Sequence, residues 1–290
     1  MLAALLPPAA IATVPAPVLN NELYITLGFL PPVTHKHTII VRGIHTPGAT
    51  IDVRVNGRLE ATGTPDGNIY WAEVHLDRGE NHIVSYAKKD GAITSADRDS
   101  FRADVSFADV DNHWAQNDVE VLATLGIVNG IAPGLFGPGL RVTRAEFAKL
   151  LVLGLSLQPE EGAVLLFRDA AAIPVWARGY VAAAVHHGLI SGFDDGTFQA
   201  NEPVNRLQMA VLLGRALQFR NDQPTGNPRR FTDESSLPDW ARTELNLAVR
   251  AGVIVGFEDG SFRPLDVTTR AQAAVAIYRV WQLTRPMRQN

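Results

Sequence analysis

The strongest constraint on the fold of this chain is a threefold repeat in its second half. Three segments after residue 106 align almost without gaps, and their equivalent Trp, Gly and Arg residues recur after 62 and then 64 positions. One such unit buries too little apolar surface to be robust, so we expect three to pack together about a pseudo-threefold axis. The units begin with FADVDNHWA at residue 107, FRDAAAIPVWA at residue 167 and FTDESSLPDWA at residue 231.

Each unit is predicted to form a helix, a short extended hairpin and a second helix. Apolar residues recur at helical spacing in the first segment, which predicts one buried face. A glycine follows, where a residue just past a helix needs a positive φ angle. A turn between apolar residues then predicts the hairpin. The residues concerned are Trp114, Val119, Leu122, Leu125, Gly126 and Pro133-Gly134 in the first unit, Trp176, Val181, Val185, Gly188 and Asp195-Gly196 in the second, and Trp240, Leu245, Val249, Gly252 and Asp259-Gly260 in the third.

The second helix of each unit opens with a capping box. The side chain of a Thr or Asn can accept a hydrogen bond from the amide three residues later, while a Glu or Gln at that position reaches back to the cap residue. An Arg follows each cap residue, at the positive end of the helix dipole, where a cation is disfavoured. The boxes are Thr143 to Glu146, Asn205 to Gln208 and Thr269 to Gln272, and the arginines are Arg144, Arg206 and Arg270.

The first part of the chain has a pattern that predicts strands. Between residues 35 and 105 apolar and polar residues alternate, and Asn56-Gly57 and Asp66-Gly67 supply two-residue turns. Several short strands with regular turns and no helix predict a β-sandwich. We interpret the Ala- and Pro-rich residues 1–20 as a leader or linker, and the polar residues 221–230 as a linker between the second and third units.

Composition argues against several classes of function. The 290 residues have a net charge of -4, which disfavours broad electrostatic binding of nucleic acid. Cysteine is absent, so disulfides and thiolate chemistry are not available. No stretch after the first residues approaches the roughly 20 apolar residues of a membrane span. The sequence has no zinc-type spacing of His residues and no catalytic motif, so we expect no metal, no cofactor and no enzyme activity.

The repeat resembles the S-layer homology (SLH) domain. The resemblance is carried by an F-x-D start, a Trp-Ala pair in the first helix, an L-G-I-V-x-G run and a T-R-A-E box. In the first unit these are Phe107 to Asp109, Trp114-Ala115, Leu125 to Gly130 and Thr143 to Glu146. The resemblance extends over residues 107–284. The second unit departs from it with Asn-Arg-Leu-Gln, and the third has Gln272 where Glu is usual.

This resemblance implies a three-unit module that anchors proteins non-covalently to bacterial cell-wall polysaccharide. The ligand is commonly a peptidoglycan-linked secondary polymer with pyruvate ketals on N-acetylmannosamine, bound in grooves between adjacent units around a central bundle of three helices. To the groove residues implied by position we add three glycines before the hairpin, which can let a ligand approach the backbone. The candidates are Arg144, Arg206, Arg270, Asp109, Asp169, Asp233, Trp114, Trp176, Trp240, Gly130, Gly192 and Gly256.

Residues 21–105 resemble the bacterial Ig-like domains of surface proteins, through the segments VRGIHTPGATIDVRVNG and TPDGNIYWAEVHLDRGENHIVSYAKKDG. This resemblance implies a spacer or adhesion module rather than an active site. The expected fold is therefore multidomain: an N-terminal all-β Ig-like sandwich at residues 21–105, followed by a mainly α SLH trimer. Its helix–hairpin–helix repeats are expected at residues 106–160, 166–220 and 231–284.

The candidate residues also have structural interpretations. Each Arg could bind a carboxylate together with the helix N-terminus, or could pair with the Asp of F-x-D. The pattern leaves both open, and the resemblance favours ligand binding. The Trp residues could stack on sugars, but their helical spacing favours the core. The glycines could be ordinary turn residues.

We therefore expect a secreted, non-enzymatic protein of the cell wall and surface layer, held there by Arg-lined grooves. One alternative is the anchor region of an exocellular glycan hydrolase, which the complete reading frame would reveal. Another is a self-assembling S-layer lattice subunit, in which self-association would give ordered sheets after calcium addition.

Overall fold

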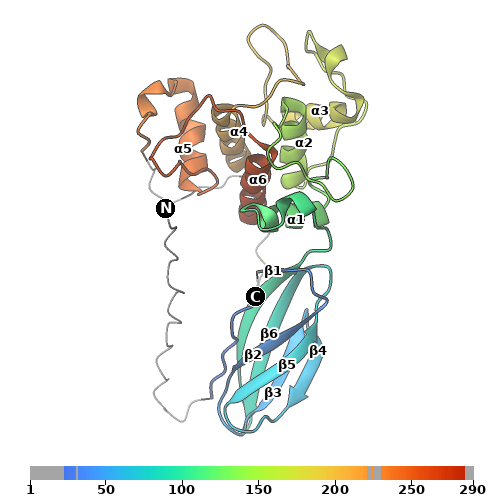
Figure 1. Cartoon of the computed structure of the whole chain (residues 1–290), viewed down its shortest axis with the longest axis vertical. Coiled ribbons are helices and arrows are strands. Elements are labelled where there is room, and N and C mark those ends of the chain that lie inside the picture. Colours follow the sequence, from blue (N-terminus) through green and yellow to red (C-terminus); the bar gives the residue numbers. More distant parts are fainter. Residues whose placement is uncertain (1–22, 31, 221–223, 225–229, 285–290) are drawn as a thin grey trace, which may run out of the picture. The chain divides into compact units, whose positions relative to one another are not determined.

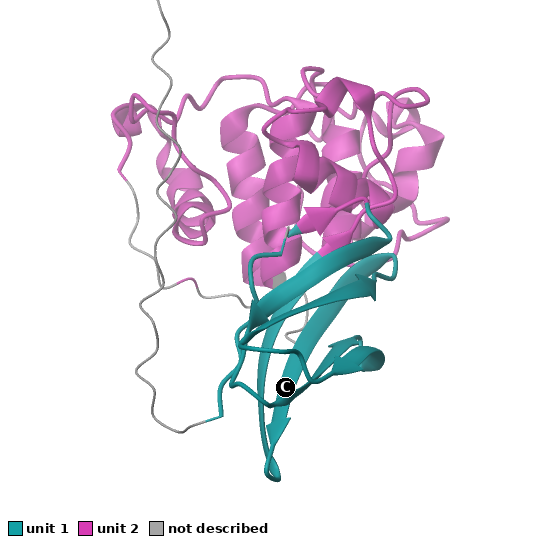
Figure 2. Cartoon of the chain, turned by 60° about the horizontal axis from the view of Figure 1, so that its bottom comes forward, with its two compact units in different colours: residues 1–32, 36–100 teal, residues 33–35, 101–290 magenta. Residues whose placement is uncertain are grey.

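The computed structural model describes residues 23–30, 32–220, 224 and 230–284. The chain divides into two compact units, which Figure 2 colours separately. The first unit contains the described residues up to Pro32 and residues 36–100, and the second contains residues 33–35 and the described residues from 101 onward. The predicted leader at 1–20 and most of the predicted linker at 221–230 lie outside the described residues.

The first unit is built from β-strands in two sheets. In one sheet the strands follow the order β7, β6, β3 and β4, and in the other β2 pairs with β5 in antiparallel register (Figure 1). β7 continues past residue 100 into the second unit, where its last residues pair in parallel with the short β1. The strands span Val33–Thr34 (β1), Thr38–Ile44 (β2), Thr50–Val55 (β3), Arg58–Gly63 (β4), Ile69–His75 (β5), Gly79–Lys89 (β6) and Ala92–Arg102 (β7).

Alternation along these strands produces the core of the first unit. Every second side chain of a strand lies on the same face. Inward residues of both sheets, such as Val41, Val53 and Val74, are buried and form one apolar cluster. The predicted turn at Asn56-Gly57 is confirmed, since these residues have φ angles of 52° and 82°, in the left-handed region that a two-residue hairpin turn requires.

The second unit confirms the prediction of two helices in each repeat. The glycine after each first helix has a φ angle between 67° and 75°, as predicted for a residue just past a helix end. All three capping boxes form. The helices span Gln116–Thr124 (α1), Arg144–Gly154 (α2), Arg178–His186 (α3), Arg206–Phe219 (α4), Arg242–Arg250 (α5) and Arg270–Thr284 (α6). Short 3-10 helices precede α1, α3 and α5, at Ala108–Val110, Ala170–Ala172, Val175–Ala177, Glu234–Ser236 and Asp239–Ala241.

The second helices of the three repeats lie together in the middle of this unit (Figure 1). Both α2 and α4 contact α6. Each second helix also packs against the first helix of the following repeat, so that α2 contacts α3, α4 contacts α5 and α6 contacts α1. Buried residues from all six helices belong to one apolar cluster. The repeats therefore share a core instead of each having its own.

Backbone hydrogen bonds connect the repeats in a closed cycle. The N–H of Val142 donates to the carbonyl oxygen of Thr268 at 3.1 Å, that of Thr268 to Val204 at 2.9 Å, and that of Val204 to Val142 at 3.0 Å. These three residues are equivalent, because each lies two positions before the arginine of its own repeat. Each repeat thus supplies backbone partners to both of the others.

Two predictions about this unit are wrong in detail. The predicted hairpin contains no regular strand in the described residues. It is a tight turn, in which Phe193 N–H donates to the carbonyl oxygen of Thr197 at 2.8 Å. Leu125 and Val185 were predicted on the buried face of the first helix but are 40% and 37% exposed. Both lie near the C-terminal end of a nine-residue helix, where the chain is about to turn away at the following glycine.

Candidate functional site

Three grooves of the helical unit are lined by equivalent residues. Each contains the arginine from the capping box of one repeat, the loop and second helix of the next repeat, and the tryptophan of the repeat after that in cyclic order. We name each groove by its arginine. The Arg144 groove has a volume of about 940 Å³, the Arg270 groove about 350 Å³ and the Arg206 groove about 90 Å³.

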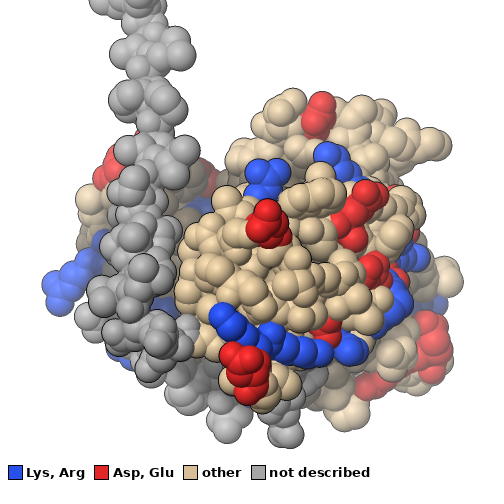
Figure 3. All heavy atoms as spheres, turned by 90° about the horizontal axis from the view of Figure 1, so that it is seen from below, with Lys and Arg blue, Asp and Glu red and all other residues tan. Residues whose placement is uncertain are grey.

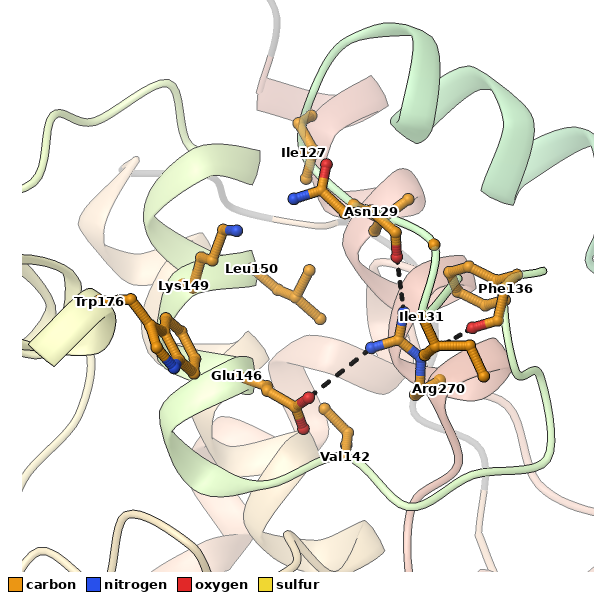
Figure 4. A pocket seen from close by; sticks show the side chains of 12 residues that line it. Ile127, Asn129, Ile131, Phe136, Val142, Glu146, Lys149, Leu150, Trp176 and Arg270 are labelled. Carbon is orange, nitrogen blue, oxygen red and sulfur yellow. Dashed lines mark hydrogen bonds and ion pairs between the residues drawn. The ribbon is translucent and has the colours of Figure 1, made fainter. Parts of the chain in front are cut away.

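Figure 4 shows the Arg270 groove. Trp176 and Lys149 lie on one side and Arg270 on the other, with Glu146 and Leu150 between them. The Lys149 ammonium lies 5.9 Å from the centre of the Trp176 ring, within the range of a cation–π interaction. The groove thus presents an aromatic face, two cations and one carboxylate.

The arginines connect each repeat to the next. Arg206 donates from Nε to the carbonyl oxygen of Phe262 at 2.7 Å and from a terminal nitrogen to that of Val255. Its guanidinium lies over the rings of Phe257 and Phe262, 4.7 Å and 5.2 Å from their centres. The equivalent contacts are those of Arg270 with the carbonyls of Phe136 and Asn129 and the Phe136 ring, and of Arg144 with the carbonyl of Ser191 and the Phe193 and Phe198 rings.

Burial lowers the pKa of all three arginines, but their charged neighbours differ. For Arg144, burial and then the like charge of Arg215 lower the pKa to about 10. For Arg206, burial again dominates, opposed mainly by the carboxylate of Asp266. For Arg270, burial is opposed by Glu146, whose carboxylate lies 3.8 Å from a terminal nitrogen of the guanidinium.

The three predicted aspartates hold the loops in shape. Asp109 accepts hydrogen bonds from the backbone N–H of Phe136 at 2.8 Å and of Gly137 at 2.7 Å. Burial raises the pKa of the Asp109 carboxyl, but these amide bonds outweigh burial, so the pKa lies below its usual value. Asp169 and Asp233 make the same pair of contacts, with Phe198 and Gln199 and with Phe262 and Arg263. The alternative of a direct ion pair between the arginines and these aspartates is wrong for the described residues, because the carboxylates accept from backbone amides instead, although Asp109 still favours the charged form of Arg270 from a distance.

The three tryptophans are exposed, and the prediction that they lie in the core is wrong. Trp114, Trp176 and Trp240 are 65%, 50% and 63% exposed, and each lines one groove. They belong to the irregular segment or 3-10 turn before the first helix, so the helical period that predicted burial does not extend to them. Their exposure leaves the indole faces available to a ligand.

The glycines before the loop are required by packing. A Cβ atom on Gly192 would lie 2.7 Å from the ring of Phe167 and 2.9 Å from the carbonyl oxygen of Thr197. Gly130 and Gly256 are equally close to the rings of Phe107 and Phe231. The phenylalanine that opens each repeat therefore packs directly on this glycine, and all three glycines also line or adjoin the grooves.

Sequence reasoning missed the second cation of each groove. Lys149, Arg215 and Arg279 line the Arg270, Arg144 and Arg206 grooves. Arg215 lies seven residues after the capping residue Gln208, and Arg279 seven after Gln272, so each is on the same helix face as its cap. A comparison of the second and third repeats shows an arginine seven residues after the capping Gln in each, and this shared spacing could have identified Arg215 and Arg279.

Two further features of the described residues are the charges on one face and the length and polarity of the helices. On the face drawn in Figure 3, basic and acidic side chains occur together, and neither sign covers it. No helix in the described part of the chain is both long enough and apolar enough to span a membrane.

Comparison with known proteins identifies the repeats. The S-layer homology domain family matches residues 106–148, 166–210 and 230–274. The chain is 31% identical over 181 residues to an amylopullulanase of Thermoanaerobacterium thermosulfurigenes, covering 62% of this chain and 10% of that protein. It is 32% identical over 176 residues to exoglucanase XynX of Acetivibrio thermocellus (60% and 16%), and 32% identical over 171 residues to S-layer protein sap of Bacillus anthracis (58% and 20%). The chain spans 10% to 20% of the length of these curated relatives.

Among solved structures, the chain is similar to fibronectin(III)-like modules of Clostridium thermocellum CbhA. The identity is 15% and the TM-score 0.24, covering 27% of this chain and 95% of that one. A likeness at this level does not assign a fold to the first unit. The repeats are assigned by sequence and position: residues 106–148, 166–210 and 230–274 are three S-layer homology domains, which are cell-wall anchoring modules.

Proposed function

We propose that the three grooves bind anionic cell-wall polysaccharide and so hold the protein on the cell wall without a covalent bond. The observation that carries this proposal is the repeated pairing, across three repeats, of a buried or largely buried arginine with an exposed tryptophan in one groove. The proposed ligand is a secondary wall polymer with pyruvate ketals on N-acetylmannosamine.

The chemistry of the grooves fits such a ligand. A guanidinium has five N–H donors, and the carbonyl contacts of Arg270 use two of them, at Nε and one terminal nitrogen. The remaining donors can bind the carboxylate of a ketal in bidentate fashion. An exposed indole can stack on the apolar face of a sugar ring. Anchoring of this kind needs no catalytic group, and we propose that these domains are not enzymes.

Two architectural expectations belong to the same proposal. The closed cycle of hydrogen bonds through Val142, Val204 and Thr268 supports packing of the SLH repeats about a pseudo-threefold axis. The two sheets of the first unit, which share one apolar core, support an Ig-like sandwich that acts as a spacer or adhesion module. Three anchoring sites on one chain would raise avidity over that of one groove.

The relatives favour two forms of the complete protein. Some are named as glycan hydrolases, such as the amylopullulanase and the endoglucanase of Bacillus sp., and others as S-layer proteins. This chain could accordingly anchor a hydrolase or belong to a surface lattice. Ordered sheets after calcium addition, seen by electron microscopy, would support the lattice, and persistent monomers would count against it.

The proposal is tested by co-sedimentation of the chain with purified cell-wall sacculi. We expect the chain to sediment with intact sacculi and to stay in solution when the secondary polymer has been removed. Sacculi that keep the polymer but have lost the pyruvate ketals by mild acid should bind much less. Binding that survives both treatments would contradict an anionic-polymer anchor.

A further inference from the structure

The three arginines have equivalent positions but different electrostatic partners. Arg270 has the carboxylate of Glu146 at 3.8 Å, and Arg206 lies in the field of the carboxylates of Asp266 and Asp233 as well as of the cation of Arg263. Arg144 has instead a second arginine, Arg215, in its groove. Among the described residues, no carboxylate lies within ion-pair distance of either of these two guanidinium groups. Asp194 is the acidic residue that lines this groove, in the loop beside Ser191.

Arg144 and Arg215 converge on one residue of the groove. Arg144 donates to the carbonyl oxygen of Ser191, and Arg215 donates to its hydroxyl oxygen at 3.4 Å. The two arginines come from different second helices, α2 and α4, so the fold itself brings them together. Like charges in a partly buried site destabilise the empty state unless an anion occupies the space between them.

The hydrogen bonds of Arg144 are also incomplete. Arg144 is only 7% exposed, yet its Nε has no hydrogen-bond partner. In the other two grooves the equivalent Nε atoms of Arg206 and Arg270 donate to the carbonyls of Phe262 and Phe136. A buried donor without a partner costs free energy, and a ligand oxygen can remove that cost. This observation is independent of the charge of Arg215.

We propose that the Arg144 groove selects a doubly negative group of the wall polymer, with Arg144 and Arg215 each binding part of the charge, whereas the Arg270 groove takes a singly negative group. The proposal rests on the proposed function and assigns to one groove a ligand class of its own. Its volume of about 940 Å³ leaves room for a charged sugar unit.

The contrast with the Arg270 groove explains the selectivity. Where the Arg144 groove has Gln208, the Arg270 groove has Glu146, whose carboxylate opposes a second negative charge on a ligand. The position equivalent to Arg215 is Leu153, so no second arginine is present on that helix face. Lys149 is the further cation of that groove, and it lies near the rings of Trp176 and Tyr180.

The test uses two probes that differ in charge. One is the 4,6-pyruvate ketal of the methyl glycoside of N-acetylmannosamine, with one negative charge, and the other is N-acetylmannosamine 6-phosphate, which is close to doubly charged at pH 8. Each groove has its own tryptophan, so the indole N–H signals of Trp240, Trp176 and Trp114 in a two-dimensional NMR spectrum report binding groove by groove.

We expect the Trp240 signal to report at least tenfold tighter binding of the phosphate probe than of the ketal probe. The Trp176 signal should show no such preference. Arg215→Gln should reduce the preference at Trp240 to threefold or less, while Arg215→Lys keeps most of it. Arg250→Gln removes one exposed arginine outside the grooves and should leave the preference unchanged. Unaltered signals of the other tryptophans show that each variant is folded.

The two levels of the proposal fail in different ways. Equal affinity of the two probes at Trp240, or an equal loss for both in Arg215→Gln, would overturn the selectivity and leave the anchoring function standing. If neither probe moved any of the three indole signals, the anchoring function itself would be contradicted, and the selectivity with it.

Discussion

Arg144, at the first turn of α2, donates from its guanidinium to the backbone carbonyl of Ser191 in the following repeat. The same side chain lines the groove in which we propose that the wall polymer binds. One residue therefore has two roles, joining two repeats and presenting a cation to a ligand. A substitution of such an arginine affects folding and binding together, and a binding test that rests on arginine variants alone cannot separate the two.

Arg206→Ala should destabilise the helical unit strongly. The change removes hydrogen bonds to the carbonyls of Phe262 and Val255 and the contact with two phenylalanine rings. Charged hydrogen bonds and a desolvated cation–π contact together suggest a loss of about 3 kcal/mol or more in the free energy of unfolding. Urea denaturation measures it, and the exposed Arg250→Ala should cost less than about 0.5 kcal/mol. A loss below about 1 kcal/mol for Arg206→Ala would contradict the role in joining repeats.

Gly192→Ala should lower stability although it adds one methyl group. Its Cβ would lie 2.7 Å from the ring of Phe167 and 2.9 Å from the carbonyl oxygen of Thr197, so the loop or the ring must move. We expect a cost of about 1–3 kcal/mol in thermal or urea unfolding. Gly139→Ala is the matched control, because nothing lies within 4 Å of its Cβ. Equal stability of the two variants would contradict the packing role of Gly192.

Asp118→Asn should stabilise the protein at neutral pH. Burial raises the pKa of the Asp118 carboxyl to about 6, and the charge of Arg279 opposes this. As pH falls, the folded chain takes up this proton before the unfolded chain does, so the contribution of Asp118 to stability rises between pH 6 and pH 4. The variant should therefore be more stable than the parent at pH 8, by on the order of 1–2 kcal/mol, and the difference should shrink towards pH 4. Melting temperatures of the variant and the parent across this pH range measure the difference in stability. A variant that is less stable than the parent at pH 8 would contradict the prediction that the charged Asp118 destabilises the fold.

Glu146→Gln should strengthen anion binding in the Arg270 groove. The second and third repeats already have Gln at this position and keep their capping boxes, so the helix start should not change. The substitution removes the carboxylate 3.8 Å from Arg270. We expect at least threefold tighter binding of N-acetylmannosamine 6-phosphate, followed at the Trp176 signal. Unchanged affinity at Trp176, with the fold intact, would mean that Glu146 does not oppose the ligand charge.

Local patterns predicted the elements of this fold well. The Asn56-Gly57 turn, the glycines after the first helices and the three capping boxes depend on residues close together in the sequence, and all are present. The alternation that predicted strands holds because both sheets share one core.

The candidate site was harder to predict because its contacts join residues far apart. Arg144 meets a carbonyl 47 residues later, and Arg270 one 141 residues earlier. The spacing of the tryptophans in the sequence fits a helical period, but each tryptophan precedes the first helix of its repeat. The prediction of burial therefore applied the helical period to residues outside the helix. Arg215 was overlooked because its equivalent in the first repeat is Leu153, which hides the position in a search for residues common to all repeats.

The central claim, that the grooves hold the wall polymer, is tested most directly by a variant in which Trp114, Trp176 and Trp240 are all replaced by alanine. These side chains are exposed, so the fold should survive while each groove loses its aromatic face. The measurement is the dissociation constant for intact sacculi, beside Trp71→Ala, which removes an exposed tryptophan of the first unit. We predict at least a hundredfold weaker binding for the triple variant and no change for Trp71→Ala. A folded triple variant that binds as tightly as the parent would contradict the claim.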